Sequence, residues 1–350
     1  MNKNLVIISS VVRGLYGLGI GALFSLLQAE QDPKWIAVYG IIGFLIAFLS
    51  RWVDAFLYRT QLRRQRFMIV LLIRSLIYFV LFILSVGFVL FVVSIIDPEL
   101  NSSEVFRYRT LREWLSGGAV IYNLLYSFLI LLAIQFVVLV LRLVGPSKVL
   151  NYLLGKYNEP IEEERIFMFM DLRSSTTIAE RLGHVKWHQF LNDFFYDIAR
   201  PVRRSQGEIY QYVGDEAVIS WPKATGLKRL NCIRCFFWIY DLMEKRRSYY
   251  LKTYGFEPIF KAGYHVGKVI VGEIGDFKRD IVFHGDVVNT ASRIQAECNA
   301  RNRRLLLSSS LLDQLQLGRD YTAEYIDKMV LRGKQEEIEL YSLDPVIPAK

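Results

Sequence analysis

Apolar residues are concentrated in four stretches before residue 145, and this uneven distribution constrains the fold more than any other feature. A helix that crosses the hydrocarbon core of a bilayer needs about twenty apolar residues. The third and fourth stretches reach that length, whereas the first carries Arg13 and the second is short. Because further spans follow the first stretch, it is not interpreted as a signal peptide. The sequence therefore predicts a four-helix transmembrane domain over residues 1–144, with spans near 5–27, 35–49, 67–96 and 119–141.

The placement of arginines predicts how these spans are oriented. The segment between the second and third spans carries five arginines and a single acid, Asp54. Under the positive-inside rule such a loop lies in the cytoplasm. Four spans then place both termini on the cytoplasmic side of the cell membrane, together with the C-terminal half. The five arginines are Arg51, Arg59, Arg63, Arg64 and Arg66.

Two further arginines fall within or beside the apolar stretches, where a charge costs at least a few kcal/mol. Arg74 is close to one end of its span, and we expect its side chain to snorkel to the headgroups. Arg13 lies deeper in its stretch. We hypothesise that it lines a ligand-sensing or packing site inside the helical bundle.

The net charge of +9 does not indicate a nucleic-acid partner. Much of the excess is arginine beside apolar spans, and no zinc-finger or recognition-helix pattern accompanies it. The three cysteines give no disulfide framework and suit a reducing cytosol. Cys232 and Cys235 form a C-x-x-C within an apolar helical run, where packing is favoured over zinc binding.

Residues 145–164 connect the two halves. Val149, Leu150, Leu153 and Leu154 recur at helical spacing, and Pro160 with neighbouring glutamates closes the segment. A short amphipathic helix that transmits movement from the membrane is one interpretation. A linker with an apolar side is the other, and the pattern does not separate them.

The second half, residues 165–343, alternates strand-like and helix-like segments. Such an order predicts an α/β sandwich with a mostly antiparallel sheet. The expected elements are strand 166–170, helix 174–200, strands 208–213 and 217–221, helix 227–251, strand 260–266, strands 268–275 and 280–283, helix 287–299, strand 304–307, and strands 321–326 and 336–343.

Two acidic motifs follow apolar strands in this half. The first, FMFMDLRSST, places Asp171 directly after a buried strand and before a helix start that is rich in hydroxyl groups. A carboxylate oxygen is a hard ligand for Mg²⁺, and a helix N-terminus offers N–H groups to phosphate oxygens. The second motif, YQYVGDE, places Asp215 at a hairpin tip. If the two strands are neighbours, both carboxylates meet at one edge of the sheet and can bind two divalent ions.

A third motif, FHGDVVNTASR, carries Asn289 and Arg293 four residues apart on a predicted helix. Residues with that spacing project from one helix face. The arginine can balance negative charge that builds on a phosphorus under attack, and the amide can position a ribose.

Together the three motifs resemble the class III adenylyl/guanylyl cyclase catalytic domain, over about Arg165 to Leu343. The order of the motifs, the 44-residue interval from Asp171 to Asp215, and the run G-D-x-V-N-x-A-S-R make the resemblance specific. It implies a ferredoxin-like βαββαβ fold, a head-to-tail homodimer, and two Mg²⁺ or Mn²⁺ ions in each active site.

The resemblance also implies the roles of individual residues. Asp171, Asp215 and the Leu172 carbonyl would bind the metal ions, while Asn289 and Arg293 would act from the other subunit. Ser174 and Ser175 stand where the family usually has glycine and an aromatic residue, but their N–H groups remain available to phosphates. The other nucleotide contacts that it implies are Thr176 beside them, Gln211, Val282 and Phe283 around the base, and Arg332 or Lys334 at the triphosphate.

The expected activity is adenylate cyclase, which converts ATP to 3′,5′-cyclic AMP and diphosphate. Gln211 and Val282 stand where adenylyl cyclases typically have a lysine and an aspartate or threonine, so GTP remains an alternative substrate. A membrane receptor with an inactive cyclase domain is the alternative of another class. A diguanylate cyclase is disfavoured because that family has no counterpart to Asn289 and Arg293.

Overall fold

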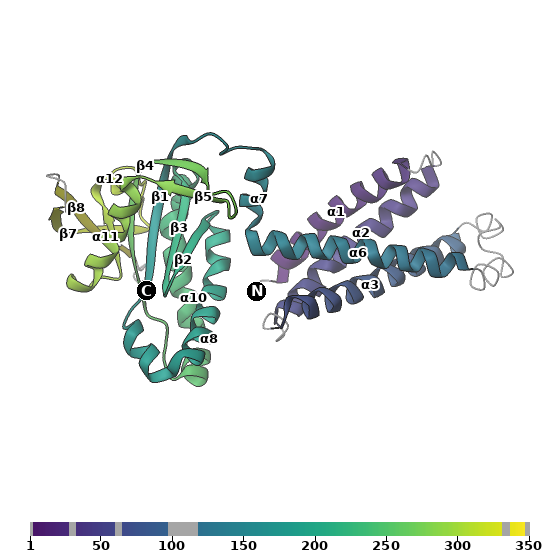
Figure 1. Cartoon of the computed structure of the whole chain (residues 1–350), viewed down its shortest axis with the longest axis horizontal. Helices are drawn as coiled ribbons and strands as arrows, with labels where there is room; N and C mark the ends of the chain where they lie inside the picture. Colours follow the sequence, from purple (N-terminus) through teal and green to yellow (C-terminus); the bar gives the residue numbers. More distant parts are fainter. Residues whose placement is uncertain (1–2, 28–32, 60–64, 97–117, 331–336, 347–350) are drawn as a thin grey trace. The chain divides into compact units, whose positions relative to one another are not determined.

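The computed structural model describes residues 3–27, 33–59, 65–96, 118–330 and 337–346. The chain forms two compact units, Met1–Val149 and Leu150–Lys350 (Figure 1). Their boundary falls inside a short helix, α7 (Pro146–Leu153), which begins the segment predicted to be a linker. Arg332 and Lys334 lie outside the described residues.

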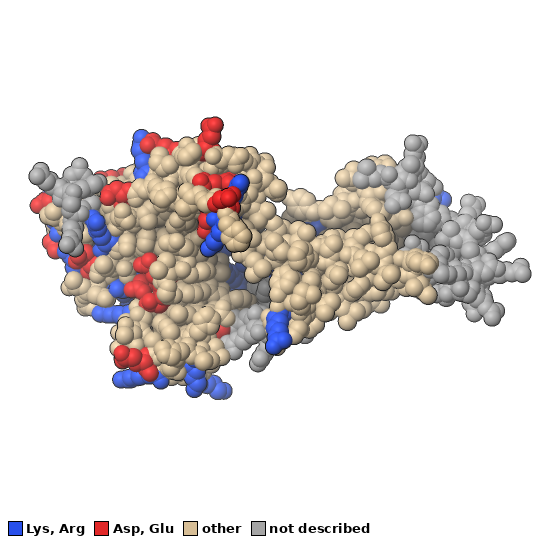
Figure 2. All heavy atoms as spheres, viewed as in Figure 1, with Lys and Arg blue, Asp and Glu red and all other residues tan. Residues whose placement is uncertain are grey.

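The described residues of the N-terminal unit form four long helices. Three of them are long and apolar enough to cross a membrane, while the apolar part of the first is shorter, Ser10–Leu26. The second stretch is not short as expected from the sequence, because its helix runs on for 27 residues. In Figure 2 these helices present few charged side chains, in contrast to the C-terminal unit. The helices are α1 (Lys3–Leu27), α2 (Pro33–Arg59), α3 (Phe67–Ile96) and α6 (Gly118–Val144).

Glycines allow the backbones of α1 and α2 to approach closely. A Cβ atom built on Gly17 would lie 2.2 Å from the carbonyl oxygen of Gly43, and one on Gly21 would lie 2.1 Å from that of Tyr39. No side chain fits in such a space. Small residues at a helix–helix interface are a common means of association in membranes, where apolar surface alone provides little driving force.

Arg74 does not snorkel as predicted. Its residue is 3% exposed, and its guanidinium donates to Asp54 at 2.9 Å and to Gln135 at 3.1 Å. The guanidinium of Arg74 is therefore bound by a buried carboxylate on the neighbouring helix instead of extending to the lipid headgroups. Asp54, counted from the sequence as part of a loop, lies within α2.

The C-terminal unit is built on an eight-stranded sheet. Strands β2, β3, β1 and β4 lie in that order and are antiparallel. With helices α8 and α10 they form the predicted ferredoxin-like βαββαβ arrangement. Strands β6, β8 and β7 extend the sheet beyond β4, and β5 pairs with β4. The strands are β1 (Ile161–Leu172), β2 (Glu208–Val213), β3 (Glu216–Pro222), β4 (Phe260–Ile274), β5 (Asp280–His284), β6 (Leu305–Ser308), β7 (Tyr321–Val330) and β8 (Glu337–Pro345).

Strand β1 is buried on both faces, which explains its unbroken apolar run. Ile166 and Met168 pack on one side with residues of α8 and α10, whereas Phe167 and Phe169 pack on the other with residues of α11. The sheet is therefore the middle layer of the unit (Figure 1). The helices are α8 (Ser175–Arg204), α9 (Lys223–Leu227), α10 (Asn231–Tyr254), α11 (Asp286–Ala300) and α12 (Ser309–Leu312).

Several element boundaries differ from the predictions. Strand β1 begins at Ile161 rather than at residue 166, and β7 runs on to Val330 rather than ending at residue 326. The segments 260–266 and 268–275, predicted as separate strands, form the single strand β4, whose first part pairs with β1 and whose last part pairs with β5. Helix α10 begins at Asn231 rather than at residue 227. Arg229 and Leu230 have left-handed φ values of 55° and 57°, and such residues interrupt a right-handed helix.

Candidate active site

Asp171 lies near the end of β1, where the chain turns into helix α8. The turn requires a left-handed residue, and Ser174 supplies it with φ 59° and ψ 30°. Glycine adopts this conformation more easily than any other residue. This accounts for the glycine that the resemblance led us to expect at this position.

Asp215 lies in the two-residue turn between β2 and β3. Gly214 opens that turn with φ +61°, as tight hairpin turns of this kind require. Because β3 pairs with β1, with Ala217 opposite Met170, the turn comes beside the end of β1. Asp215 lies close enough to Asp171 to raise the pKa of its carboxyl group. The two predicted metal ligands are thus brought together.

The acidic groups at this edge of the sheet disfavour one another's ionisation. Burial, followed by the proximity and charge of Asp215, raises the pKa of Asp171 to about 6. Burial and the charges of Asp171 and Asp215 raise the pKa of Glu216 to about 7. The Oδ2 atom of Asp215 is buried and has no hydrogen-bond partner in the described part of the chain. A divalent cation at this position would satisfy that atom and relieve the repulsion.

Two side chains hold Asp171 from other elements. Lys261 is the direct cross-strand partner of Asp171 on β4, and its Nζ lies 3.4 Å from Asp171 Oδ2. Gln295 of α11 donates to the same oxygen at 3.2 Å. Helix α11 can come this close because Gly263 of β4 has no side chain; a Cβ there would lie 2.2 Å from the backbone nitrogen of Gln295.

Asn289 and Arg293 lie on the opposite face of α11. The buried residues of this helix are Val287, Thr290, Ala291, Ile294, Gln295 and Cys298. At 100° per residue, they occupy one side of the helix, and Asn289 and Arg293 project from the other. Asn289 is exposed and Arg293 is half-buried. The helix therefore turns one face toward Asp171 and presents the predicted Asn/Arg pair away from it.

Comparison with known families gives this geometry a context. The family described as "Adenylate and Guanylate cyclase catalytic domain" matches residues 158–345, more than half of the chain. The chain belongs to this family. Its members generally use divalent metal ions, and the crowded carboxylates of Asp171 and Asp215 fit that use. No group of three or more His, Cys, Asp or Glu side chains forms a closed metal site among the residues that the structure describes.

Individual relatives agree with the family match. The chain is 37% identical over 200 residues to adenylate cyclase 2 of Rhizobium meliloti, a match that covers 57% of this chain and 55% of the relative. It is 26% identical over 207 residues to an adenylate cyclase of Anabaena cylindrica, covering 57% and 41%. The chain thus spans about half the length of these relatives or less. A bacterial light-regulated adenylyl cyclase structure shares the fold, with a TM-score of 0.51 and 22% identity, covering 61% of this chain and 62% of the other.

The residues predicted around the base lie on two strands of the cyclase unit. Gln211 is exposed on β2, and Val282 is half-buried on β5. Their neighbours Tyr210 and Phe283 bring these strands together, with ring centroids 4.7 Å apart. Phe283 also contacts Phe167 in the core, so it serves packing in the single chain. Ser175 and Thr176 begin α8, as predicted.

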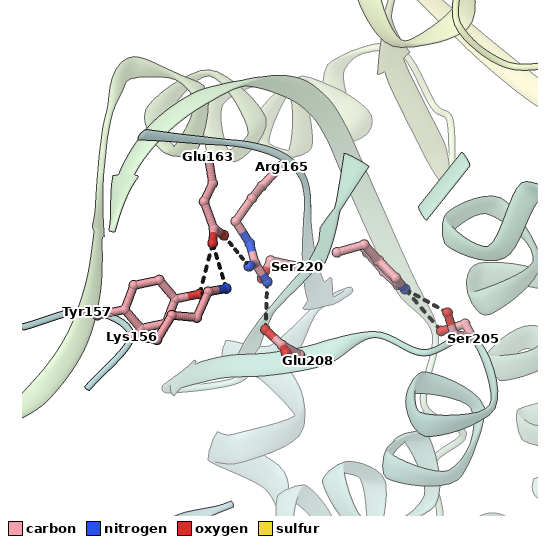
Figure 3. Close-up of polar contacts among 8 residues, drawn as sticks. Lys156, Tyr157, Glu163, Arg165, Ser205, Glu208 and Ser220 are labelled. Carbon is pink, nitrogen blue, oxygen red and sulfur yellow. Dashed lines mark hydrogen bonds and ion pairs between the residues drawn. The ribbon is translucent and has the colours of Figure 1, made fainter. Parts of the chain in front are cut away.

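A network around Arg165 was not anticipated from the sequence (Figure 3). This arginine is 2% exposed and donates to Glu163 at 2.9 Å, to Glu208 at 2.6 Å and to Ser220 at 2.9 Å. Glu163 also accepts from Tyr157 at 3.0 Å. The network ties β1 to β2 and β3, the strands that carry the Asp215 turn. Charged residues flanking an apolar strand are common, so no sequence signal distinguished this one.

The contacts of Lys261 and Gln295 with Asp171 were also not predicted, because no sequence signal distinguished these two residues. Lys261 stands between apolar residues of β4, and Gln295 is one of several polar residues of α11. Only the pairing of β4 with β1, and the packing of α11 on β4, bring them to Asp171. The one available signal for Lys261 was its position: a positively charged side chain within an otherwise apolar strand needs a negatively charged partner.

Proposed function

We propose that the C-terminal unit converts a purine nucleoside triphosphate, ATP in preference, to the 3′,5′-cyclic monophosphate and diphosphate. The 3′-oxygen of the ribose would form a bond to the α-phosphorus, and the bond from that phosphorus to the bridging oxygen would break. The hydroxyl proton is released to solvent or to a leaving oxygen. The convergence of Asp171 and Asp215 at one edge of the sheet carries this proposal. The names of the two relatives support ATP.

Asp171 and Asp215 would hold two Mg²⁺ or Mn²⁺ ions, with the Leu172 carbonyl as a further ligand. Such ions, when bound, make a hydroxyl more acidic and neutralise charge on phosphate oxygens. Lys261 and Gln295 keep the Asp171 carboxylate in place through its Oδ2 atom.

The active site is proposed to form between two copies of the chain. Asn289 and Arg293 project away from Asp171 of their own chain, so they suit the site of a partner. There Arg293 would stabilise negative charge that develops on the transferred phosphorus, and Asn289 would orient the ribose. A head-to-tail homodimer would then contain two complete sites.

The choice of purine depends on Gln211 and Val282. A valine side chain forms no hydrogen bond, whereas the amide of Gln211 can present a donor or an acceptor to either base. Ser174, Ser175 and Thr176 would offer N–H groups to the phosphates at the start of α8. GTP is the alternative substrate, because neither base-facing residue selects adenine by charge.

The helices of the N-terminal unit are proposed to anchor the protein in the cell membrane. Three of them are long and apolar enough to span it. The C-terminal unit would then lie in the cytoplasm, where nucleoside triphosphates are present. We further propose that the membrane unit regulates the cyclase through the segment that includes α7.

The first test is turnover of ATP and of GTP, offered separately to the full-length chain with Mn²⁺. We expect cyclic AMP to form, and Asp171→Asn to abolish it. Asp276→Asn, an exposed acid in the β4–β5 turn, is the matched control and should retain activity. If only cyclic GMP forms, the substrate is GTP and not ATP. If the folded protein turns over neither nucleotide, the proposal is refuted.

The shared site is tested by co-expressing two inactive variants that carry different tags. Asp171→Asn and Arg293→Ala should each be inactive alone. A purified heterodimer should recover part of the activity, because one of its two sites contains neither substitution. Arg319→Ala, on an exposed arginine, controls for loss of surface charge. Absence of recovery in a folded heterodimer would exclude the site between chains.

A further inference from the structure

The N-terminal unit contains a polar cluster that is centred on Asp54 of α2. The residue is 6% exposed, and its Oδ1 atom accepts hydrogen bonds from Arg74 at 2.9 Å and from Tyr78 at 3.2 Å. Both donors belong to α3. Arg74 continues to Gln135 of α6, to which it donates at 3.1 Å. This side of the carboxylate is therefore bound by buried groups.

The other carboxylate oxygen faces two more arginines. Arg13 of α1 lies 3.3 Å from Oδ2, and Arg142 of α6 lies 3.6 Å from it. Their side chains are 46% and 36% exposed, whereas that of Arg74 is 4% exposed. The two guanidinium nitrogens are within about 7 Å of one another, the sum of their distances to the shared oxygen. Arg13 and Arg142 thus reach the same point from the open side of the cluster.

The cluster carries more positive than negative charge. Asp54 is the one acidic side chain among the described residues of the N-terminal unit, and three guanidinium groups surround it. Two positive charges therefore remain in excess. A charge beside hydrocarbon is costly unless a group of opposite sign accompanies it.

The position of the cluster indicates where such a group comes from. The apolar spans of α2 and α6 end at Asp54 and at Val144, so Arg142 lies two residues inside the end of its span. At 1.5 Å per residue this is about 3 Å. The apolar part of α1 begins at Ser10, so Arg13 lies three residues inside its start. Both exposed arginines are therefore near the margin of the apolar region, close to the lipid headgroups.

We propose that Arg13 and Arg142 form a binding site for a phosphate-bearing anion, and that the headgroup of an anionic phospholipid supplies it. A phosphate group that accepts a hydrogen bond of about 2.8 Å from each guanidinium spans the gap between them. Asp54 binds both arginines from the inner side of the cluster, so their guanidinium groups are already positioned when the lipid binds. The site is separate from the nucleotide site and does not depend on turnover.

The test uses the full-length chain in nanodiscs, with thermal unfolding of the helical unit as the measurement. One series replaces phosphatidylcholine by phosphatidylglycerol; a second adds inorganic phosphate to phosphatidylcholine nanodiscs, against chloride at equal ionic strength. We expect phosphatidylglycerol to raise the unfolding midpoint in a saturable way. Removing one arginine should raise the half-saturating content of phosphatidylglycerol about fivefold, as expected for one cation at the membrane surface.

The variants are Arg142→Gln and Arg13→Gln, and the control is Arg66→Gln, an exposed arginine outside the cluster. If Arg142→Gln does not fold, Arg13→Gln and the wild-type titration still decide the question. A midpoint that rises with inorganic phosphate alone would assign the site to a free anion. The proposal is overturned if neither series raises the midpoint, or if the two cluster variants respond as the control does.

Discussion

Replacing Arg165 by methionine should destabilise the cyclase unit by about 3 kcal/mol. Removing one partner of a buried charge pair costs about 3–5 kcal/mol, because the remaining charge loses its compensation. Here the lower end applies, since the Glu208 side chain is 38% exposed and can turn to water. Glu163 keeps its hydrogen bond from Lys156 at 2.9 Å. Methionine is flexible and fills most of the space, so the cavity contribution stays small.

The assay is thermal unfolding of the fragment 150–350, followed by circular dichroism near neutral pH. For a domain of this size, 1 kcal/mol shifts the midpoint by about 2–4 °C, so we expect a decrease of roughly 6–12 °C. Lys223→Met is the matched control. Its ion pair with Glu164 spans 3.0 Å between side chains that are 32% and 50% exposed, and surface pairs contribute less than about 1 kcal/mol.

The difference between wild type and Arg165→Met should also depend on pH. Burial alone would raise the pKa of Glu163, but hydrogen bonds from Lys156 and Arg165 outweigh it and hold the pKa below its usual value. A lowered pKa in the folded state stabilises above the unfolded value and is lost as the pH falls through the folded value. The difference should therefore shrink below about pH 4.5. If Arg165→Met and Lys223→Met lower the midpoint equally, the network does not stabilise the sheet.

Four further predictions concern three parts of the chain. Ser174→Gly should stabilise the cyclase unit by about 0.5 kcal/mol in the same assay, because glycine relieves the left-handed φ at a small cost in entropy; a lower midpoint would contradict this. Mn²⁺ should raise the midpoint more at pH 8 than at pH 5.5, since Asp171 and Glu216 take up protons as the pH falls through about 6–7; an equal rise at both values would argue against carboxylate ligands. Without metal, the same raised pKa values predict that stability falls as the pH rises from about 4 to 7, because the folded state must then give up protons that the unfolded state has already lost. Gly17→Leu should destabilise the helical unit by about 1–3 kcal/mol, whereas Gly19→Leu, where a Cβ meets nothing within 4 Å, should not.

Local patterns in the sequence were sufficient for the framework of both units. Apolar runs of about twenty residues predict membrane helices, because the thickness of the bilayer imposes that length. The order of strands and helices predicts an α/β sandwich with a mostly antiparallel sheet. The resemblance that the three motifs carry implies its ferredoxin-like arrangement, with Asp171 beside Asp215. The helices, the sheet and the acidic pair are found as predicted, because each depends on residues that are close together in the chain or on a topology with few alternatives. That the helices cross a membrane stays a prediction.

These local patterns did not predict contacts between elements that are distant in the sequence. Arg74 was expected to reach the headgroups, yet a carboxylate on the neighbouring helix binds it. Lys261 and Gln295 come to Asp171 only after β4 pairs with β1 and α11 packs on Gly263. The depth at which a polar side chain lies, and the partner it meets there, depends on packing that no short segment specifies.

The amino-acid sequence by itself thus determined the two units, the order of their elements and the acidic pair, since periodicity and short motifs act over one element or one turn. The tertiary structure alone decided which charges share a partner: Arg165 with Glu208, Lys261 with Asp171, and the arginines around Asp54. Electrostatic energy depends on distance and burial. Both quantities exist only once the elements have packed.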